Sequence, residues 1–335
     1  MITIALLGAG FMGQAHATNY RALGDRVRVK TVCSRDRERA AKLAAQLGAE
    51  ATTDLDAAID DPEIDAVDIC LPTPLHRATA ERALGQGERA KHVFLEKPIA
   101  LTVEDADAIV AAAAASDRVF MVGLVLRFWP EYVELQRRVA SGELGRPRAV
   151  SALRLSPPAD WNDWMRDPAQ SGGTPVDLMI HDFDQLNWLL GAPRRVHAHE
   201  PAPGHVLALV EYDGASGIVE GSMAMPRSYP FSSNIRVLCE GGTAEYAFSA
   251  APAEDGGNIG APTAARGLRL YPVDGDVRTV DVESADPWGP ELEEFVECVE
   301  QGRRPEHGTG AQARDALRLS LAARRSIASG RPEHV

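Results

Sequence analysis

The sequence has few cysteines, no long apolar run and no excess of positive charge, and each shortage excludes a class of protein. Its four cysteines, Cys33, Cys70, Cys239 and Cys298, lie far apart and form no C-x-x-C pair. Buried free thiols explain them better than disulfides or a metal site. No apolar run approaches the length of a membrane span, and the segment MITIALLGAG lacks the basic region and cleavage site of a signal peptide. We therefore expect a cytoplasmic protein with no membrane partner.

Positive charge is scarce relative to negative charge. The 335 residues include 35 Lys and Arg against 48 Asp and Glu, which is a formal net charge of −13. A protein that binds nucleic acid needs a basic face for the phosphates, so this balance argues against a nucleic-acid partner. With 45% hydrophobic and 25% charged residues, the composition is that of an ordinary globular protein, and the length suffices for two domains.

The first third of the chain alternates strand-like and helix-like segments. Short apolar runs occur at 2–8, 27–33, 66–72, 91–98 and 119–126, and apolar residues recur with helical spacing between them. Strands that alternate with helices of this length predict parallel βαβ units and a doubly wound sheet. We expect this α/β domain to cover residues 1–124.

The pattern changes after this point. A helix is predicted from Pro130 to about Ser141. A run of strand-like segments follows, joined by turn signals such as Asp213-Gly214 and Gly241-Gly242. One predicted helix, over 176–191, interrupts this run. The pattern is typical of an α+β domain with an open, mostly antiparallel sheet, which we place at residues 125–311.

The segment GAGFMG, residues 8–13, has the spacing G-x-G-x-x-G directly after the first strand and at the start of a helix. In a dinucleotide-binding loop these glycines permit a tight turn, a close backbone approach to the pyrophosphate, and close helix–strand packing. The helix N-terminus adds free N–H groups and a positive dipole end. The motif alone is weak, but here it has the βαβ context it needs. We expect the cofactor to contact Gly8, Gly10, Phe11, Met12 and Gly13.

The end of the second strand, CSRDRERA, favours NADP over NAD. A carboxylate at this point would favour NAD, whereas a nearby arginine accommodates the additional phosphate of NADP. Ser34 stands where the acid is expected and Arg35 follows it, so a hydroxyl and a guanidinium can bind a phosphate together. Asp36 is either the displaced acid or, as we prefer, the N-cap of the next helix. The arginines are alternatively a solvated helix face.

A charged pair follows the fourth strand, in the segment KHVFLEKP. Glu96 and Lys97 come directly after the apolar stretch VFL, and Pro98 ends the strand. Charges are costly to bury unless a partner or a function holds them. Ligands of doubly wound sheets lie at the carboxyl ends of the strands. Lys97 is therefore expected beside the cofactor, where it can hold a substrate oxygen, carry a proton or fix the nicotinamide. The alternative is a surface ion pair with Glu96.

A second group of reactive side chains lies in the segment SGGTPVDLMIHDFDQ, residues 171–185. Asp177 and His181 are four residues apart and would share one face of a helix, with Asp184 three residues further on. A histidine with a carboxylate in reach is the usual general acid or base at neutral pH. Taken alone, such a pair is more often structural. A metal site is a weaker alternative because no second histidine has helical ligand spacing here, and we predict no metal.

Together these motifs resemble one family. GAGFMGQAH near the start, LPTPLH after the third strand, EKP after the fourth, GLVLRF after the fifth and GGTPVDLMIHDFD in the middle are similar to the Gfo/Idh/MocA oxidoreductases. The combination of EKP with D-x-x-x-H is the specific part. The resemblance implies a Rossmann domain, a second domain whose open sheet makes a homodimer or homotetramer contact, and a last helix, 312–335, that returns toward the N-terminal domain.

The resemblance also implies an activity. Members of this family oxidise or reduce a secondary hydroxyl of a sugar, a sugar derivative or a cyclitol with a nicotinamide cofactor. Lys97 would be the catalytic lysine that holds the substrate oxygen, His181 would accept the hydroxyl proton, and Asp177 would orient that group. Thr174 stands where the family has a third glycine, which is a mild departure.

The resemblance extends to further residues that stand at the family's motif positions. Those on the cofactor side are Pro72, Thr73, His76 and Glu96, and Arg127 matches a polar residue of the substrate cleft. Trp161 is expected at the substrate, near Trp164 and Arg166, because aromatic faces stack on sugar rings, and ordinary packing is an equal alternative.

Two other functions share the fold that the resemblance implies. One is a cofactor-binding sensor without chemistry. The other is a different reductase reaction, such as imine reduction or glycoside cleavage through transient oxidation. The presence of Lys97, Asp177 and His181 together favours a hydroxyl-oxidising enzyme, although a fold by itself does not settle function.

Overall fold

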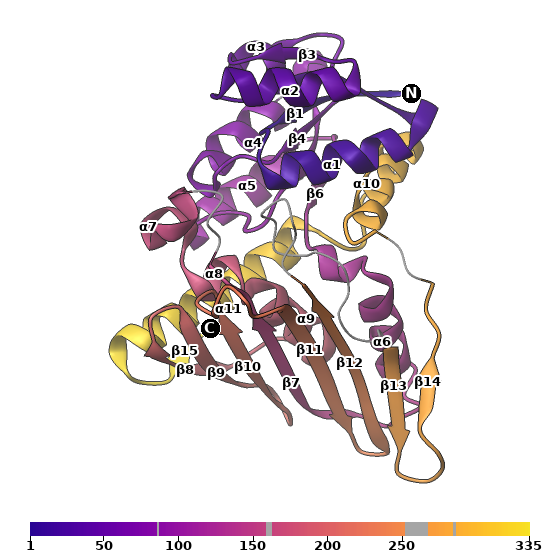
Figure 1. Cartoon of the computed structure of the whole chain (residues 1–335), viewed down its shortest axis with the longest axis vertical. Helices are drawn as coiled ribbons and strands as arrows, with labels where there is room; N and C mark the ends of the chain where they lie inside the picture. The colour runs from indigo at the N-terminus through magenta and orange to yellow at the C-terminus, as the bar shows by residue number, and fades with distance from the viewer. Residues whose placement is uncertain (86, 159–162, 252–266, 284–285) are drawn as a thin grey trace. The chain divides into compact units, whose positions relative to one another are not determined.

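The computed structural model describes residues 1–335 except 86, 159–162, 252–266 and 284–285 (Figure 1). The chain forms two compact units, Met1–Trp129 with Ala285–Arg314, and Pro130–Ser284 with Asp315–Val335. This division differs from the predicted one. Residues 286–314 lie in the first unit, and residues 315–335 lie in the second. The predicted return of the last helix, 312–335, toward the N-terminal domain stays a prediction.

The first unit is a parallel sheet with helices (Figure 1). Its described strands pair in parallel in the order β3-β2-β1-β4-β5-β6. The strands are β1 (Ile2–Leu7), β2 (Val27–Cys33), β3 (Glu50–Thr52), β4 (Ala66–Ile69), β5 (His92–Leu95) and β6 (Phe120–Val122). The helices are α1 (Phe11–Ala22), α2 (Arg37–Leu47), α3 (Leu55–Asp60), α4 (His76–Leu84), α5 (Val103–Ala115) and α10 (Gly289–Gln301), with 3-10 turns η1 (Gly24–Arg26), η2 (Thr73–Leu75), η3 (Gly87–Arg89) and η4 (Val125–Arg127). The predicted doubly wound α/β domain is confirmed.

Local sequence explains where these elements begin. β4 is buried along its whole length, as expected for a central parallel strand covered on both faces. The side chain of Asp36 accepts the N–H groups of Glu38 and Arg39 and so caps α2, and Thr102 caps α5 by accepting the Asp105 N–H. The Asp36 cap was predicted. The strand β3 was missed because it is a three-residue edge strand with mostly exposed side chains.

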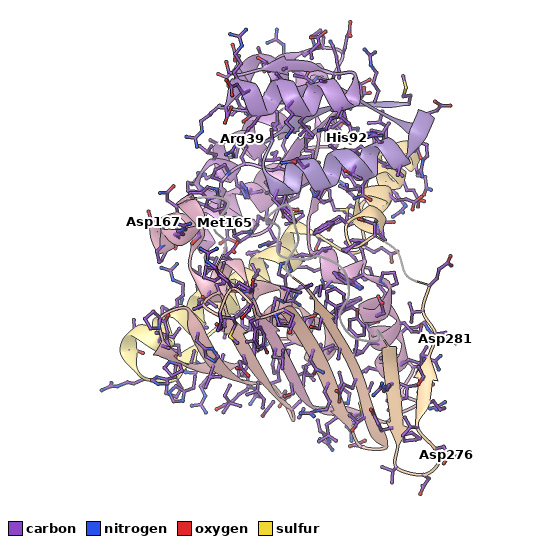
Figure 2. The ribbon with its side chains drawn as sticks, viewed as in Figure 1. Arg39, His92, Met165, Asp167, Asp276 and Asp281 are labelled. Atoms are coloured by element: carbon purple, nitrogen blue, oxygen red, sulfur yellow. The ribbon has the colours of Figure 1, made fainter. Side chains whose placement is uncertain are left out.

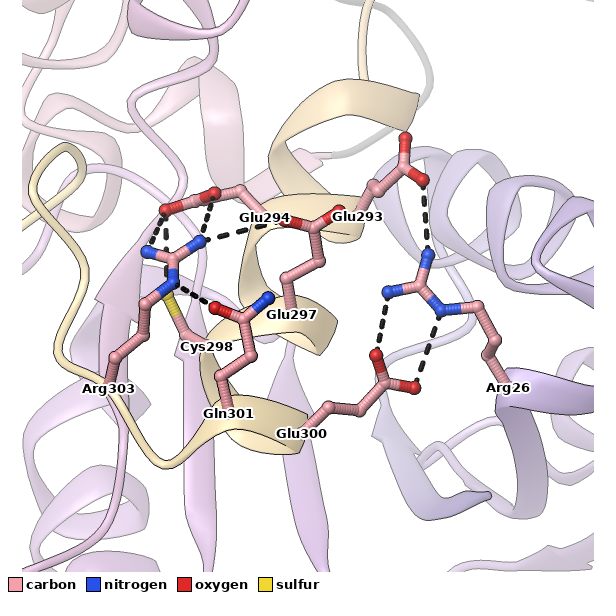
Figure 3. A network of polar contacts seen from close by, with 8 residues as sticks. All are labelled: Arg26, Glu293, Glu294, Glu297, Cys298, Glu300, Gln301 and Arg303. Carbon is pink, nitrogen blue, oxygen red and sulfur yellow. Dashed lines mark hydrogen bonds and ion pairs between the residues drawn. The ribbon is translucent and has the colours of Figure 1, made fainter.

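The helix α10 belongs to the first unit through charged and apolar contacts. The guanidinium of Arg26 pairs with Glu293 at 3.1 Å and with Glu300 at 2.8 Å (Figure 3). On its buried side, Phe295 packs edge-on against Phe94 of β5, with 5.6 Å between ring centroids. These contacts are long-range in sequence, so periodicity alone could place the helix but not its partner.

The second unit is built on an open sheet. Its described strands follow the order β14-β13-β12-β11-β7-β10-β9-β8-β15. All neighbours are antiparallel except β7 and β10, which are parallel. The strands are β7 (Pro147–Leu155), β8 (Arg195–Ala202), β9 (His205–Glu211), β10 (Ser216–Ser222), β11 (Phe231–Cys239), β12 (Gly242–Ala250), β13 (Gly267–Pro272), β14 (Arg278–Val280) and β15 (Glu333–His334). The predicted mostly antiparallel sheet is confirmed.

Helices cover one face of this sheet. They include α6 (Pro130–Ala140), which contacts β12, and α9 (Ile180–Leu190), which contacts β7 and β10. Glycines on β10 permit this approach. A Cβ on Gly217 would lie 2.2 Å from Leu186, and a Cβ on Gly221 would lie 2.2 Å from Met179. The remaining helices are α7 (Pro168–Ser171), α8 (Thr174–Asp177) and α11 (Gly310–Ser329), with the 3-10 turn η5 (Asp163–Arg166).

The four cysteines are free thiols, as predicted. Burial raises the pKa of the Cys33 and Cys239 thiols to about 11. Among the described helices, none combines the length and apolar character that a membrane span requires.

Candidate active site

Four loops of the first unit follow the carboxyl ends of neighbouring parallel strands. They are residues 8–13 after β1, 70–76 after β4, 96–98 after β5 and 123–127 after β6. Because β1, β4, β5 and β6 are consecutive in the sheet, these loops lie along one edge. This edge is where ligands of doubly wound sheets bind.

The glycine loop after β1 has the geometry that its spacing predicts. Gly8 has a φ of +124°, and a Cβ there would lie 2.3 Å from the carbonyl oxygen of Cys70. A Cβ on Gly13 would lie 2.0 Å from the Gly8 carbonyl oxygen. Gly10 is the N-cap of α1 and has no side chain to accept the first N–H groups of the helix. The N-terminus of α1 therefore presents backbone N–H groups that no side chain caps, and such groups suit a phosphate.

The end of β2 carries a hydroxyl and guanidinium groups. The Ser34 hydroxyl accepts the N–H of Asp36 at 3.3 Å. Asp36 is engaged as the cap of α2 and pairs with Arg39 at 3.2 Å, on the helix where Figure 2 labels Arg39. Arg35 is exposed. The preferred interpretation of Asp36 as an N-cap is confirmed, so its carboxylate is already occupied by backbone donors.

The loop after β4 is tied to the loop after β5 by His76. Its Nδ1 lies 3.0 Å from the carbonyl oxygen of Pro98, and its Nε2 lies 2.8 Å from that of Leu71. The ring is buried, and this burial lowers its pKa. Thr73 is also buried, and Pro72 precedes the η2 turn. His76 thus lies beneath these loops, where it can fix their spacing.

Glu96 and Lys97 occupy the end of β5. Glu96 is 5% exposed. One of its carboxylate oxygens, Oε2, accepts the Lys97 backbone N–H at 3.0 Å, and the other, Oε1, lies 3.2 Å from His16 Nε2. Gly123 keeps the space beside this carboxylate open, because a Cβ there would be 3.2 Å from Oε1. The backbone of Lys97 is therefore held by the side chain of its neighbour. Arg127, in η4 after β6, is buried in the same unit.

The second unit places Asp177 and His181 around a break in the predicted helix. Asp177 ends α8, and His181 is in the first turn of α9. The N–H of Met179 bonds to the carbonyl of Thr174, five residues back, and two residues, Leu178 and Met179, separate the two helices. The single helix expected over 176–191 is thus two. Asp177 is buried, and His181 is partly exposed.

A buried ion pair fixes the first turn of α9. The Asp182 carboxylate, which is fully buried, accepts two hydrogen bonds from the Arg154 guanidinium of β7, at 2.9 and 3.0 Å. Burial by itself would lower the pKa of Arg154, but the charge of Asp182 raises it. The same guanidinium lies 5.8 Å from the centroid of the Phe231 ring. This pair holds the backbone next to His181.

The structure gives the surroundings of three other residues that were expected near the substrate. Asp184 is buried within α9. Trp164 of η5 is half-buried, and Arg166 is exposed. Trp161 lies outside the described residues.

Sequence reasoning missed three buried polar residues of the first unit, His16 of α1, Asp68 of β4 and Glu291 of α10. Asp68 had a visible signal, since it is a charge inside the apolar strand segment AVDIC, where an unpartnered carboxylate is costly. His16 lies within GAGFMGQAH, directly after the glycine loop. No sequence pattern points to Glu291, because it lies near the other buried groups only after α10 packs in the first unit.

Two family models match most of the chain. Residues 2–124 match the oxidoreductase family with an NAD-binding Rossmann fold, and residues 132–245 match the GFO/IDH/MocA C-terminal domain. The first unit is therefore the nucleotide-binding part of an oxidoreductase.

The relatives extend this match over the whole length. The scyllo-inositol 2-dehydrogenase (NAD(+)) of Bacillus subtilis (strain 168) is 30% identical, over 99% of this chain and 95% of that protein. Inositol 2-dehydrogenase 4 of Saccharopolyspora erythraea is 28% identical, over 98% and 93%. Among solved structures, UDP-N-acetylglucosamine 3-dehydrogenase from Acidithiobacillus ferrooxidans has a TM-score of 0.81 at 26% identity, over 98% of both chains. The chain belongs to the GFO/IDH/MocA family of oxidoreductases, as its motifs predicted.

Proposed function

We propose that this protein transfers a hydride between a nicotinamide cofactor and a secondary hydroxyl or ketone of a sugar, a sugar derivative or a cyclitol. The observation that carries the proposal is Lys97, whose backbone is held by Glu96 at the carboxyl end of β5. That position is on the ligand-binding edge of a sheet whose glycine loop suits a dinucleotide. The names of relatives that span the chain, inositol dehydrogenases among them, support the substrate class.

The residues around the glycine loop fit a dinucleotide. Gly8 and Gly13 could not carry a side chain without displacing backbone, and the N-terminus of α1 is uncapped by any side chain. Residues 8–13 would hold the pyrophosphate, and the loop that contains Pro72, Thr73 and His76 would flank the nicotinamide side. When bound, this cofactor supplies the hydride acceptor or donor.

The choice between NAD and NADP is a finer proposal. Ser34 and the exposed Arg35 at the end of β2, with Asp36 occupied as a cap, support NADP. The name of the Bacillus subtilis relative points instead to NAD(+). The ratio of kcat/KM for the two cofactors in the wild type and in Arg35→Ala decides between them. If Arg35 binds the phosphate, the substitution weakens use of NADP and leaves use of NAD nearly unchanged.

The substrate-side roles rest on the motif. We assign Lys97 to the substrate oxygen, His181 to acceptance of the hydroxyl proton as hydride leaves the carbon, and Asp177 to orientation of that group. Arg127 and Trp161 are further candidates for substrate contact.

The test is an absorbance assay at 340 nm with purified protein. The panel contains inositols, aldoses, anhydrosugars, sugar acids and nucleotide sugars, each with NAD and NADP and in both directions. Lys97→Met and His181→Ala should each lower kcat by about 10²–10⁴-fold, while cofactor binding, followed by fluorescence, is retained. Lys42→Met is the matched control, because Lys42 is an exposed lysine of α2, and it should keep full activity.

Two outcomes would contradict this function. One is normal turnover by Lys97→Met or His181→Ala. The other is intact cofactor binding with no turnover on any member of the panel, which would favour a sensor of the same fold.

The open sheet of the second unit supports a homo-oligomer. Large apolar side chains are about half exposed on its uncovered face, with Leu209 of β9 directly opposite Ile218 of β10. The set is Leu207, Leu209, Ile218 and Leu238. Exposed apolar side chains that lie next to one another, as Leu209 and Ile218 do, are typical of protein interfaces. We propose a homodimer or homotetramer formed through this face, and a cytoplasmic location, which the four free thiols support.

A further inference from the structure

A cluster of buried titratable groups lies next to Glu96 in the first unit. It draws on α1, β4 with the residue after it, the end of β5, and α10, and its members are His16, Tyr20, Asp68, Cys70, Glu96 and Glu291. Four different segments thus place ionisable side chains together inside an otherwise apolar core. Apart from Glu96, none of these groups has a part in the proposed chemistry, so the cluster needs its own explanation.

His16 is held between two carboxylates. Its Nδ1 lies 2.8 Å from Asp68 Oδ2, and its Nε2 lies 3.2 Å from Glu96 Oε1. Among the described residues Nε2 has no partner in hydrogen-bond geometry, so its contact with Glu96 is a charge contact. Only the imidazolium supplies the positive charge for this contact and carries a proton on both ring nitrogens. Burial alone would lower the pKa of His16, but the charge of Asp68 raises it, and the net shift is well above the usual value. The Cys70 thiol completes this side, since its Sγ lies 3.3 Å from Asp68 Oδ1.

Glu291 is the most isolated carboxyl group of the cluster and is fully buried. Within the described part of the chain, neither of its carboxyl oxygens has a hydrogen-bond partner. Burial, and next the charge of Glu96, raise its pKa well above the usual value. Glu96 is the carboxylate that faces His16.

We propose that His16 is a positioning residue for Lys97, acting through the Glu96 carboxylate. One oxygen of this carboxylate faces His16 and the other accepts the Lys97 N–H. Asp68 fixes the ring from behind, and the lack of a side chain at Gly123 leaves a close-fitting space for the carboxylate. If His16 no longer holds Glu96, the carboxylate can rotate and release the Lys97 backbone. This inference rests on the proposed role of Lys97 in hydride transfer.

The test compares two variants that lose the same charge. His16→Gln keeps an N–H donor near the position of Nε2, toward Glu96, whereas His16→Asn keeps one near Nδ1, toward Asp68. The control is His92→Asn at the opposite end of β5, where Figure 2 labels His92 and where its Nδ1 accepts the Val119 N–H. Steady-state kinetics from pH 6 to 10, cofactor binding and thermal unfolding are measured for all three.

The expected result separates positioning from folding. His16→Asn should lower kcat by about 10²-fold, as small displacements of a catalytic group do, with little change in the KM for cofactor. His16→Gln should recover a large part of kcat, and His92→Asn should keep the kcat of the wild type. Equal kcat values in the two His16 variants, or unaltered kcat and pH profiles with only a lower Tm, would overturn the proposal.

A second pair of measurements does not depend on turnover. In the wild type, ¹⁵N NMR should show His16 as the imidazolium at pH 8, and the Lys97 amide should exchange slowly with solvent. In His16→Asn that amide should exchange faster. A neutral His16, unchanged exchange at Lys97, or a stoichiometric metal ion bound through His16 would each overturn the positioning role. If the wild type oxidises nothing, the proposed function fails, but these measurements still decide whether His16 holds Lys97.

Discussion

The buried pair of Arg154 and Asp182 gives the sharpest test of what holds α9 in place. Asp182→Asn removes the charge of a fully buried carboxylate and leaves a guanidinium that is only 6% exposed without its counter-ion. Two unit charges about 4 Å apart interact by about 4 kcal/mol at an effective dielectric constant of about 20. Breaking one side of a buried pair costs about 3–5 kcal/mol. We expect a loss of this size in the free energy of unfolding.

The assay is urea unfolding at pH 7.5, followed by circular dichroism, with two comparison variants. Glu211→Gln breaks an equally bidentate pair with Arg195 on the same sheet, but both side chains of that pair are more than 40% exposed. It should cost less than about 1 kcal/mol, and salt should diminish the effect. The double variant Arg154→Met with Asp182→Leu should regain most of the stability lost by Asp182→Asn, because no charge remains buried. Equal losses in Asp182→Asn and Glu211→Gln would refute the reasoning.

Three further outcomes are expected. Gly13→Ala should abolish cofactor binding, measured by fluorescence titration, because its Cβ would lie 2.0 Å from the Gly8 carbonyl oxygen; normal affinity would contradict the close packing of α1. Burial lowers the pKa of His92 to about 4 in the folded protein, whereas an unfolded histidine titrates near 6.5. Keeping this ring neutral therefore stabilises the fold above pH 6.5, and this stability is lost as the pH falls toward 4. His92→Asn should therefore show a shallower acid decline of unfolding free energy, and an unchanged decline would contradict this. Ile218→Lys, on the exposed face of β10, should yield a smaller species in light scattering than the wild type; an unchanged mass would exclude this face as the contact.

The parts of the fold that sequence reasoning recovered are those that depend on local patterns. Apolar runs alternating with helical segments predicted the parallel sheet, and Asp36 was correctly placed as a helix cap. The glycine spacing predicted the turn at Gly8 and the close packing at Gly13. Each of these features is set by neighbours within a few residues, which a single sequence displays.

The limits of the two units depend on contacts that are distant in sequence. The helix α10 was placed in the second domain by its position in the chain, whereas it packs on the first unit through Arg26 and Phe94, more than 190 residues away in sequence. The break between α8 and α9 was missed because no glycine or proline marks it, and Leu178 and Met179 continue the apolar pattern of the segment. Lys97, Asp177 and His181 were found by motif, and their catalytic roles stay predictions.

From its sequence alone this protein is a two-part α/β and α+β chain with a dinucleotide loop, a lysine after a buried strand and the family motifs of an oxidoreductase. Those properties follow from periodicity, turn chemistry and short motifs, which are written in adjacent residues. Only the tertiary structure brought His16, Asp68, Glu96 and Glu291 together around one buried site, or paired Arg154 with Asp182. The reason is physical. A buried charge needs partners from several segments of the chain, and the fold, not the spacing of residues, decides which segments meet.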